Sequence, residues 1–142
     1  MLLALWTGEP VNHHGAHLTV DDVRFRPRPV QQPRIPVWGA ALWPRRPGLR
    51  RAATLDGVMP FDPRLKGFDG ADVARILDVV TEERQARGVA ADAPFDVVIA
   101  GHLPDMPLDE LERAGATWAL ESFMPMASLA VAGETVAAGP PR

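Results

Sequence analysis

Short apolar runs alternate with helical patterns from residue 35 to the end of the chain, and this alternation is the strongest constraint on the fold. The apolar runs predict strands at residues 35–39, 58–61, 95–100 and 117–120. The remaining stretches predict helices at residues 48–55, 71–87, 108–114 and 127–138. Strands that alternate with helices form parallel sheets. We therefore expect an α/β fold of parallel βα repeats, the content of half of a TIM (β/α)8 barrel.

The clearest elements are one helix and one strand in the middle of the chain. Val73, Ile76, Leu77 and Val80 recur at helical spacing within residues 71–87. The run "DVVIAG" is almost continuously apolar, as expected of a parallel strand that is buried on both faces. A complete TIM barrel needs about 250 residues. A chain of 142 residues therefore fits half of one.

The first part of the chain follows a different pattern. Residues 1–6 look like the last turn of a helix, which Gly8 ends. The stretch "VNHHGAHLTVDDVRF" predicts a small β-hairpin insert with turn residues at Gly15 and at Asp21–Asp22. The proline-rich "RPRPVQQPRIP" predicts an extended connector, because proline lacks a backbone donor. We expect a division into residues 1–34, with helix end, hairpin and connector, and residues 35–142, with the βα units.

Composition excludes several classes of protein. The chain has no cysteine, which removes disulfides, thiolate metal sites and cysteine nucleophiles. It has no apolar run of the length of a membrane span and no recognisable signal peptide, so we expect a cytoplasmic protein. Residues 24–51 hold eight arginines and no acidic residue, although the net charge of the chain is −3. An anionic ligand is therefore most compatible with this region.

The order of several sequence features resembles the luciferase-like monooxygenase family. They are the helix end "LWTGEPV", the insert ending in "VRFRPRPVQQPRIPVW", a glycine-bearing loop, the helical "RRAA" and the strand "DGVMPF". The resemblance continues more weakly through "FDVVIAG", "AGATWALESF" and "AGPPR". It implies a TIM barrel of which this chain is the carboxy-terminal half, with strands five to eight.

The same resemblance implies an activity and a cofactor. Members are oxidoreductases or monooxygenases that use FMN or its deazaflavin analogue to act on a small organic substrate. Both barrel halves contribute contacts to the flavin and the substrate. The resemblance thus predicts that this chain completes a site by pairing with a complementing half-barrel or with a second copy of itself, as a homodimer.

The carboxyl ends of the strands are the expected location of the site, because loops that follow barrel strands carry function. The loop after the first predicted strand leads through two arginines into a helix, and small residues, guanidinium donors and a helix start together suit a phosphate. In the family, the equivalent loop contacts the flavin phosphate. The expected cofactor-binding residues are Gly39, Ala40, Ala41, Leu42, Trp43, Arg45 and Arg46. Trp43 has two interpretations, a wall for the flavin ring or an ordinary core tryptophan.

His102 is the candidate catalytic residue, because it directly follows the strand "DVVIAG" and imidazole suits proton transfer near neutral pH. Asp62, Lys66 and Glu121 follow other predicted strands and are weaker candidates at the same face. The alternative for each of them is an ordinary loop residue.

Other interpretations remain open at this point. His13, His14 and His17 have a metal-like spacing, but Gly15 favours a surface turn, and we expect no metal site. A lid that contacts the substrate is the other alternative for this hairpin. The arginines permit a nucleic-acid binder, which we do not expect, because neither a reading helix nor an aromatic platform accompanies them. A non-catalytic half-barrel that self-associates through unpaired strand edges is the main rival. Motifs of dinucleotide-binding, P-loop and α/β-hydrolase proteins do not occur.

Overall fold

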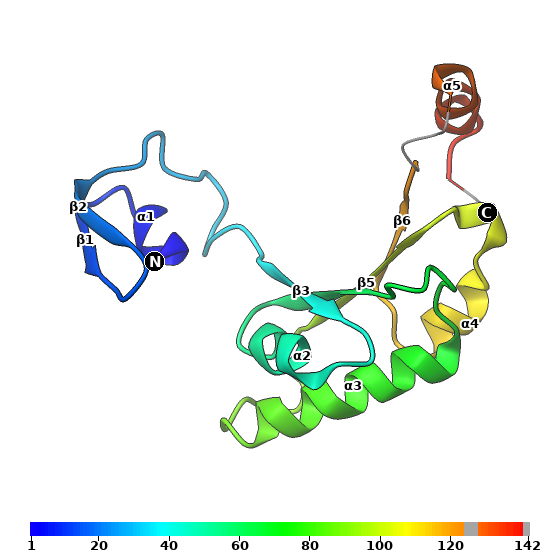
Figure 1. Ribbon diagram of the computed structural model, residues 1–142, viewed down its shortest axis with the longest axis horizontal. Coiled ribbons are helices and arrows are strands. Elements are labelled where there is room, and N and C mark those ends of the chain that lie inside the picture. The colour runs from blue at the N-terminus through cyan, green and yellow to red at the C-terminus, as the bar shows by residue number, and fades with distance from the viewer. Residues whose placement is uncertain (124–127, 141–142) are drawn as a thin grey trace. The chain divides into compact units, whose positions relative to one another are not determined.

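The computed structural model describes residues 1–123 and 128–140. The chain divides into two compact units, Met1–Pro36 and Val37–Arg142, which we describe separately (Figure 1). The first unit ends at Pro36, two residues beyond the expected boundary at residue 34, and includes all prolines of the connector.

The first unit contains one helical turn and one hairpin. Helix α1 spans Leu2–Leu5, and strands β1 (Val11–His14) and β2 (Thr19–Val23) pair antiparallel. The predicted helix end, the hairpin and its turn at Gly15 are confirmed, with the Gly15 N–H donating to the Leu18 carbonyl.

The predicted turn at Asp21–Asp22 is wrong, because both residues lie within β2. Asp22 has a left-handed φ of 49°, the local feature that the turn prediction detected. The sheet absorbs it through a register shift opposite Val11 and His13. The Asp22 N–H also donates to the Asn12 side chain at 2.8 Å.

The second unit is a parallel sheet with helices between consecutive strands. Its strands follow the order β3-β4-β5-β6, which is also their order in the chain. The elements are β3 (Trp38–Leu42), α2 (Arg46–Ala52), β4 (Gly57–Phe61), α3 (Gly70–Gln85), β5 (Asp96–Gly101), the 3-10 turn η1 (Leu103–Asp105), α4 (Leu108–Arg113), β6 (Trp118–Glu121) and α5 (Leu129–Ala138). The prediction of parallel βα repeats is confirmed, and the arrangement is compatible with part of an α/β barrel.

Helices α2, α3 and α4 lie on one side of this sheet (Figure 1). The hydrophobic core lies between these helices and the sheet. Residues of β3, β4 and β5 that point toward these helices are almost inaccessible to solvent, with Val58 and Val97 at 0% exposure. Ile76 of α3 is also fully buried, as its helical spacing predicts. None of the residues of α5 is buried. Residue 127, the expected first residue of this helix, lies outside the described residues.

Strand β3 begins at Trp38, three residues later than predicted. Pro36 has no N–H to donate to a sheet, so Ile35 and Pro36 stay in the connector. Pairing with β4 starts at Trp38 opposite Gly57 and continues to Leu42 opposite Phe61. The residues 40–42, predicted to lie beyond the strand, are therefore part of it. The chain leaves the sheet at Trp43.

Helix α2 begins at Arg46, two residues earlier than predicted. Pro47 lies in its first turn, where the missing N–H of proline has no helical partner to lose. Arg45 is the residue before the helix and has an extended backbone. The two arginines of the predicted phosphate loop therefore lie at the junction of loop and helix.

Small residues bring α2 unusually close to β3. A Cβ atom added to Gly39 would lie 2.8 Å from the Cβ of Ala52, and one added to Gly48 would lie 2.7 Å from the Cα of Ala41. Both distances are too short for carbon atoms that are not bonded to each other. Each position therefore requires glycine, because Ala52 lies against Gly39 and Ala41 lies against Gly48. The role of Gly39 is thus explained by packing, whereas the sequence suggested close approach to a phosphate.

The opposite side of the sheet is apolar, and α2–α4 do not cover it. Parallel neighbours in register point to the same side, so Leu42 and Phe61 share it at the carboxyl end. We call this surface the open face and define it by Trp38, Leu42, Met59, Phe61 and Trp118. Leu42 is 42% exposed, Phe61 52% and Trp118 51%. Parallel sheets normally bury both sides, which makes this exposure exceptional.

At the amino ends of the strands, the open face is held together by one aromatic and polar cluster. The rings of Trp38 and Trp118 lie 5.8 Å apart between centroids. The Trp38 indole N–H donates to Asp96 Oδ2 at 2.9 Å, and the Thr117 hydroxyl donates to Asp96 Oδ1 at 3.2 Å. This cluster joins β3, β5 and β6 at the amino ends of the strands.

The Gly39→Ala variant tests the close contact between β3 and α2. The new methyl group would push Ala52 away, so we expect a loss of about 1–3 kcal/mol in the free energy of unfolding. Denaturant titration followed by circular dichroism measures it. The matched control is Gly133→Ala in α5, where an added Cβ meets nothing within 4 Å and helix propensity favours alanine. Equal stability of the two variants would contradict the packing role of Gly39.

Candidate functional site

The carboxyl ends of β3–β6 bring four short segments to one edge of the sheet. Trp43 and Arg45 follow β3, Asp62 follows β4, His102 follows β5, and Ser122 follows β6 after Glu121. The Ser122 N–H donates to the Gly101 carbonyl, which extends the pairing of β5 and β6 to this edge. The polar side chains at this edge form the candidate site.

The expected cofactor-binding residues divide between the two sides of β3. Gly39 and Ala41 are buried against α2, whereas Ala40 and Leu42 are exposed on the side of the open face. Trp43 lies in the core, and Arg45 and Arg46 are exposed beyond the strand. Contact of any of these residues with a cofactor stays a prediction.

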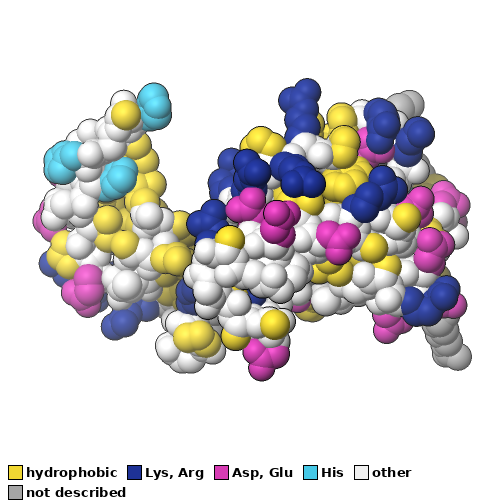
Figure 2. Space-filling view, turned by 90° about the horizontal axis from the view of Figure 1, so that it is seen from below, with side chains coloured by type: hydrophobic (Ala, Val, Ile, Leu, Met, Phe, Trp, Pro, Cys, Tyr) yellow, Lys and Arg dark blue, Asp and Glu magenta, His cyan; other side chains and the backbone are white. Residues whose placement is uncertain are grey.

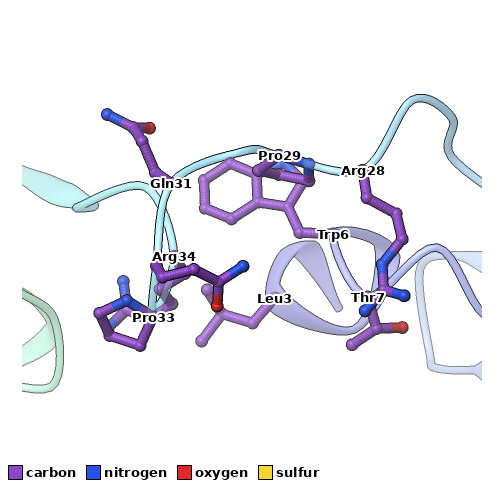
Figure 3. Close-up of a pocket in the computed structure, with 9 residues that line it drawn as sticks. Leu3, Trp6, Thr7, Arg28, Pro29, Gln31, Pro33 and Arg34 are labelled. Atoms are coloured by element: carbon purple, nitrogen blue, oxygen red, sulfur yellow. The ribbon is translucent and has the colours of Figure 1, made fainter.

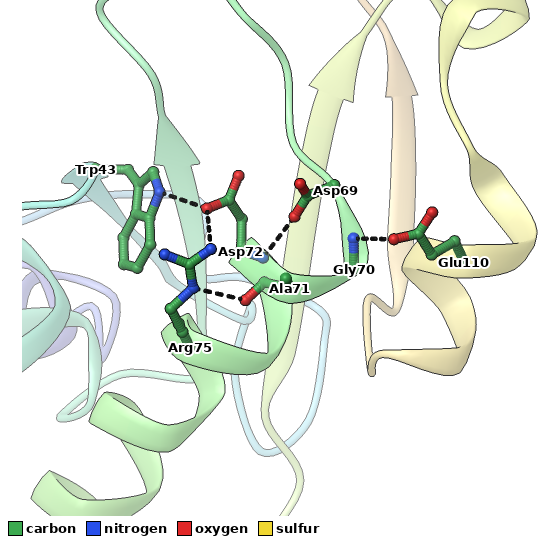
Figure 4. Close-up of polar contacts among 7 residues, drawn as sticks. All are labelled: Trp43, Asp69, Gly70, Ala71, Asp72, Arg75 and Glu110. Atoms are coloured by element: carbon green, nitrogen blue, oxygen red, sulfur yellow. Dashed lines mark hydrogen bonds and ion pairs between the residues drawn. The ribbon is translucent and has the colours of Figure 1, made fainter.

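Trp43 is a packed core tryptophan, the second of the two interpretations of this residue. Its side chain is 7% exposed, and its indole N–H donates to Asp72 Oδ1 at 3.0 Å (Figure 4). The same carboxylate oxygen lies 3.5 Å from Arg75, one turn further along α3. The ring therefore anchors the end of β3 to α3.

The amino terminus of α3 already holds two carboxylates of the protein. Asp69 accepts from the Asp72 N–H at 2.8 Å, and Glu110 of α4 accepts from the Gly70 N–H at 2.9 Å (Figure 4). Helix amino termini attract anions because their first N–H groups lack helical partners. In this helix the protein itself supplies those anions.

The arginines of α2 differ in how far they are paired. Arg50 forms an ion pair with Glu83 at 2.7 Å, and Arg51 donates to the Ala40 carbonyl at 3.3 Å. Arg46 lies 3.9 Å from Glu82, at the limit of an ion pair. Arg45 makes no side-chain hydrogen bond or ion pair with any described residue. Arg45 and Arg46 are therefore the most available cations of this segment.

Basic and acidic side chains are intermixed over the helix-covered side of the second unit (Figure 2). The ion pairs between α2 and α3 account for part of this mixture. A continuous basic surface, which would suit a nucleic-acid backbone, is not visible on this face.

Asp62 anchors the loop that follows β4. Its carboxylate is 4% exposed and accepts from the backbone N–H of Arg64 at 3.0 Å and from its guanidinium at 3.1 Å. The backbone bond from Arg64, followed by its side-chain bond and charge, lowers the pKa of Asp62. Leu65 has a left-handed φ of 54°, which is uncommon for a leucine. Asp62 thus holds a tight loop in place, and Arg64 was missed by the sequence analysis.

His102 and Glu121 meet across β5 and β6. The Nδ1 atom of His102 lies 2.9 Å from Glu121 Oε1, and the Leu103 N–H donates to Glu121 Oε2 at 3.1 Å. The hydrogen bond to Glu121 raises the pKa of His102 above 6.5, and the same bond lowers the pKa of Glu121. Two residues that sequence analysis named separately therefore form one pair. No described residue hydrogen-bonds to the Nε2 atom of His102.

A family model described as luciferase-like monooxygenase matches residues 1–104. The match covers the first unit and the second unit as far as η1, so it includes β3–β5 and His102. The chain belongs to the luciferase-like monooxygenase family. At the level of the family, this identifies an oxidoreductase and confirms the resemblance seen in the sequence. No curated protein matches the chain.

In this family member, the histidines of the hairpin are surface residues. His14 Nε2 lies 3.2 Å from Asp21 Oδ1, and both side chains are about two-thirds exposed, at 67% and 68%. No group of three or more metal-ligating side chains occurs among residues 1–123 and 128–140. Within the same ranges, no helix has the length and apolarity needed to cross a membrane.

The first unit has a shallow pocket of its own, about 250 Å³ in volume (Figure 3). Trp6 and Leu3 of the helical end line it together with Arg28, Pro29 and Arg34 of the connector. Its wall combines proline and tryptophan rings with arginine side chains. It contains none of the residues at the carboxyl ends of the sheet.

The pKa of Asp62 leads to a prediction for stability at acid pH. Because this pKa is lowered in the folded state, the carboxylate stabilises the fold fully above the unfolded value near 3.8. That stability is lost as the pH falls through the folded pKa. We expect Asp62→Asn to flatten this acid dependence, measured by urea unfolding at a series of pH values. Asp21→Asn, at an exposed pair, should leave the dependence unchanged. An unchanged slope in Asp62→Asn would contradict the assignment.

Proposed function

We propose that this chain provides half of the barrel of a flavin-dependent oxidoreductase and binds the phosphate of FMN, or of the deazaflavin analogue, through Arg45 and Arg46. The observation that carries the proposal is the position of these two available cations directly after the carboxyl end of β3, where the chain leaves the sheet for α2. Guanidinium groups bind phosphate with paired, charge-assisted hydrogen bonds. Family membership supports the class of cofactor.

The residues at this edge fit the two chemical halves of a flavin. Leu42 and Phe61 are register partners at the carboxyl end of the open face and are exposed, as a surface for an aromatic ring requires. Ala40, on the same side of β3, is small enough to allow close approach. Gly39, Ala41 and Trp43 support this surface from the helix side. A bound flavin supplies the redox chemistry, so the protein needs no nucleophile of its own.

We further propose that His102 is the catalytic residue that exchanges a proton with a small organic substrate. It lies at the same edge of the sheet, its side chain is half exposed, and its partner carboxylate is mostly buried. Imidazole is suited to this role because it gains and loses a proton near neutral pH. The remaining contribution of the chain is to exclude water through the apolar residues of the open face.

A second half-barrel is the proposed partner of the open face. Four parallel strands with helices on one side leave both β3 and β6 as edge strands. Two such halves together have the eight strands of a closed barrel, which buries both edges and the open face. A second copy of this chain supplies the required strands and the apolar side chains. A separate complementing half would satisfy the same constraint.

Removal of the two arginines tests the cofactor site. We expect Arg45→Ala and Arg46→Ala each to weaken FMN binding about tenfold or more, since a charge-assisted hydrogen bond contributes about 1.5–3 kcal/mol. Quenching of FMN fluorescence during titration with the protein measures the dissociation constant. Arg50→Ala is the matched control, because Arg50 is already paired with Glu83. Equal affinity of all three variants and the unaltered chain would overturn the phosphate assignment.

An acidic side chain on the open face tests the partner. We expect Phe61→Glu to convert the self-associated chain into a monomer, because the face would have to bury a charge. Light scattering coupled to size-exclusion chromatography measures the mass. Val30→Glu is the control, since Val30 is 94% exposed in the first unit. If the unaltered chain is a monomer at all concentrations, self-association through this face is wrong.

A non-catalytic half-barrel that self-associates is the second candidate function. The unpaired edges of β3 and β6 favour it, because edge strands are templates for pairing. The two experiments separate the candidates. A dimer that binds neither FMN nor the deazaflavin supports the non-catalytic alternative, and binding that depends on Arg45 supports the enzyme.

A further inference from the structure

We propose that Glu121 is the positioning residue of His102: its carboxylate accepts a hydrogen bond from the Nδ1–H group and fixes the neutral ring in the tautomer whose Nε2 atom takes up a proton. Nothing in the family match assigns a role to Glu121, which lies beyond the matched residues. The inference deepens the proposed function and rests on it for the use of His102 in catalysis. The geometry of the pair does not depend on a cofactor.

The fold brings the two residues together through adjacent parallel strands. Glu121 is the last residue of β6 and pairs in register with Gly101, the last residue of β5. His102 follows Gly101 directly, so its ring lies beside the carboxylate. The contact is therefore a consequence of strand register at the carboxyl edge.

Both oxygens of the carboxylate are engaged, which fixes its orientation. Oε1 lies 2.9 Å from Nδ1 of His102, and Oε2 accepts from the Leu103 N–H at 3.1 Å. Rotation of the carboxylate would break the second bond when it breaks the first. Glu121 thereby ties the loop after β5 to the end of β6.

The chemistry of the two groups decides which ring nitrogen carries the proton. The Glu121 side chain is 14% exposed, and the hydrogen bond from His102 lowers its pKa, so it is ionised. An ionised carboxylate has no hydrogen to donate and only accepts. Nδ1 must therefore be the donor, and in the neutral ring the lone pair lies on Nε2.

The ring nitrogen that is not bonded to Glu121, Nε2, is the one that can meet a substrate. The His102 side chain is 50% exposed, whereas the carboxylate beneath it is mostly buried. When a substrate O–H or N–H gives its proton to Nε2, the electron pair of the broken bond stays on the substrate atom and the ring becomes an imidazolium ion. Glu121 stabilises that positive charge, as an orienting carboxylate does in other His–carboxylate pairs.

One further charge acts on the ring. Asp105 of η1 also raises the pKa of His102 through its negative charge, without a hydrogen bond to the ring. This gives a matched comparison, because Glu121→Gln and Asp105→Asn each remove one negative charge. Only Glu121→Gln also replaces a group that can only accept a hydrogen bond from Nδ1 with an amide that can donate as well.

Nitrogen-15 and proton NMR of the whole labelled chain tests the inference without any flavin. The four histidines are assigned by substitution and titrated with pH. In the unaltered chain, we expect neutral His102 to be protonated on Nδ1. In Glu121→Gln, we expect its pKa to fall toward 6.5 and the Nε2-protonated form to appear.

The controls separate positioning from general electrostatics. Asp105→Asn should lower the pKa of His102 by less and leave the tautomer unchanged. Asp21→Asn, at the exposed pair with His14 in the first unit, should leave the signals of His102 unchanged. Neutral His102 protonated on Nε2 in the unaltered chain would overturn the proposal, as would identical titrations of the Glu121 and Asp105 variants. If Glu121→Gln does not fold, the tautomer of the unaltered chain decides alone.

The same samples distinguish failure of this inference from failure of the proposed function. If the chain binds no FMN but neutral His102 is protonated on Nδ1, the Glu121–His102 pair is supported and the enzyme assignment is wrong. If the chain binds FMN but neutral His102 is protonated on Nε2, the cofactor site is supported and the role proposed for Glu121 is wrong.

Discussion

A parallel sheet has to bury both of its sides, and this constraint organises the second unit. Helices α2–α4 satisfy it on one side, where Val58, Val97 and Ile76 are fully buried. Gly39 and Gly48 allow the first of these helices to approach the sheet within van der Waals contact. The other side keeps Phe61 and other large apolar groups accessible, and the proposals for partner and cofactor both follow from it.

Polar contacts divide the sheet into two ends with different roles. At the amino ends, Asp96 accepts from the side chains of Trp38 and Thr117 and thereby joins three strands. At the carboxyl ends, Asp62 holds a loop and Glu121 holds His102. Carboxylates therefore stabilise both ends. At the carboxyl end, they also fix side chains that can meet a ligand, as is typical of sheets built from βα repeats.

Sequence patterns were sufficient for the repeated elements and insufficient for their ends. Helix α3 and strand β5 were predictable, because helical spacing and a continuous apolar run each identify one structure. The start of β3 was not, since the pattern does not show that Pro36 and the pairing with Gly57 delay the strand. That shift of three residues moved the expected phosphate loop into the strand.

The candidate site was predictable in location and not in its contacts. His102, Asp62 and Glu121 follow strands, so their common edge could be inferred from sequence order alone. The pairing of His102 with Glu121 depends on which residues of β5 and β6 are in register, and sequence spacing does not contain that information. Arg64 was missed because its role is to bind its neighbour Asp62 within a tight loop.

The sequence alone determined the class of fold, the family and the edge at which polar residues gather, because periodicity and the order of motifs are properties of the chain. Tertiary structure decided which face of β3 each small residue occupies, that Trp43 belongs to the core, and that Glu121 is the partner of His102. The physical reason is that hydrogen bonds and close packing depend on strand register and helix approach. Both arise only when segments distant in sequence come into contact.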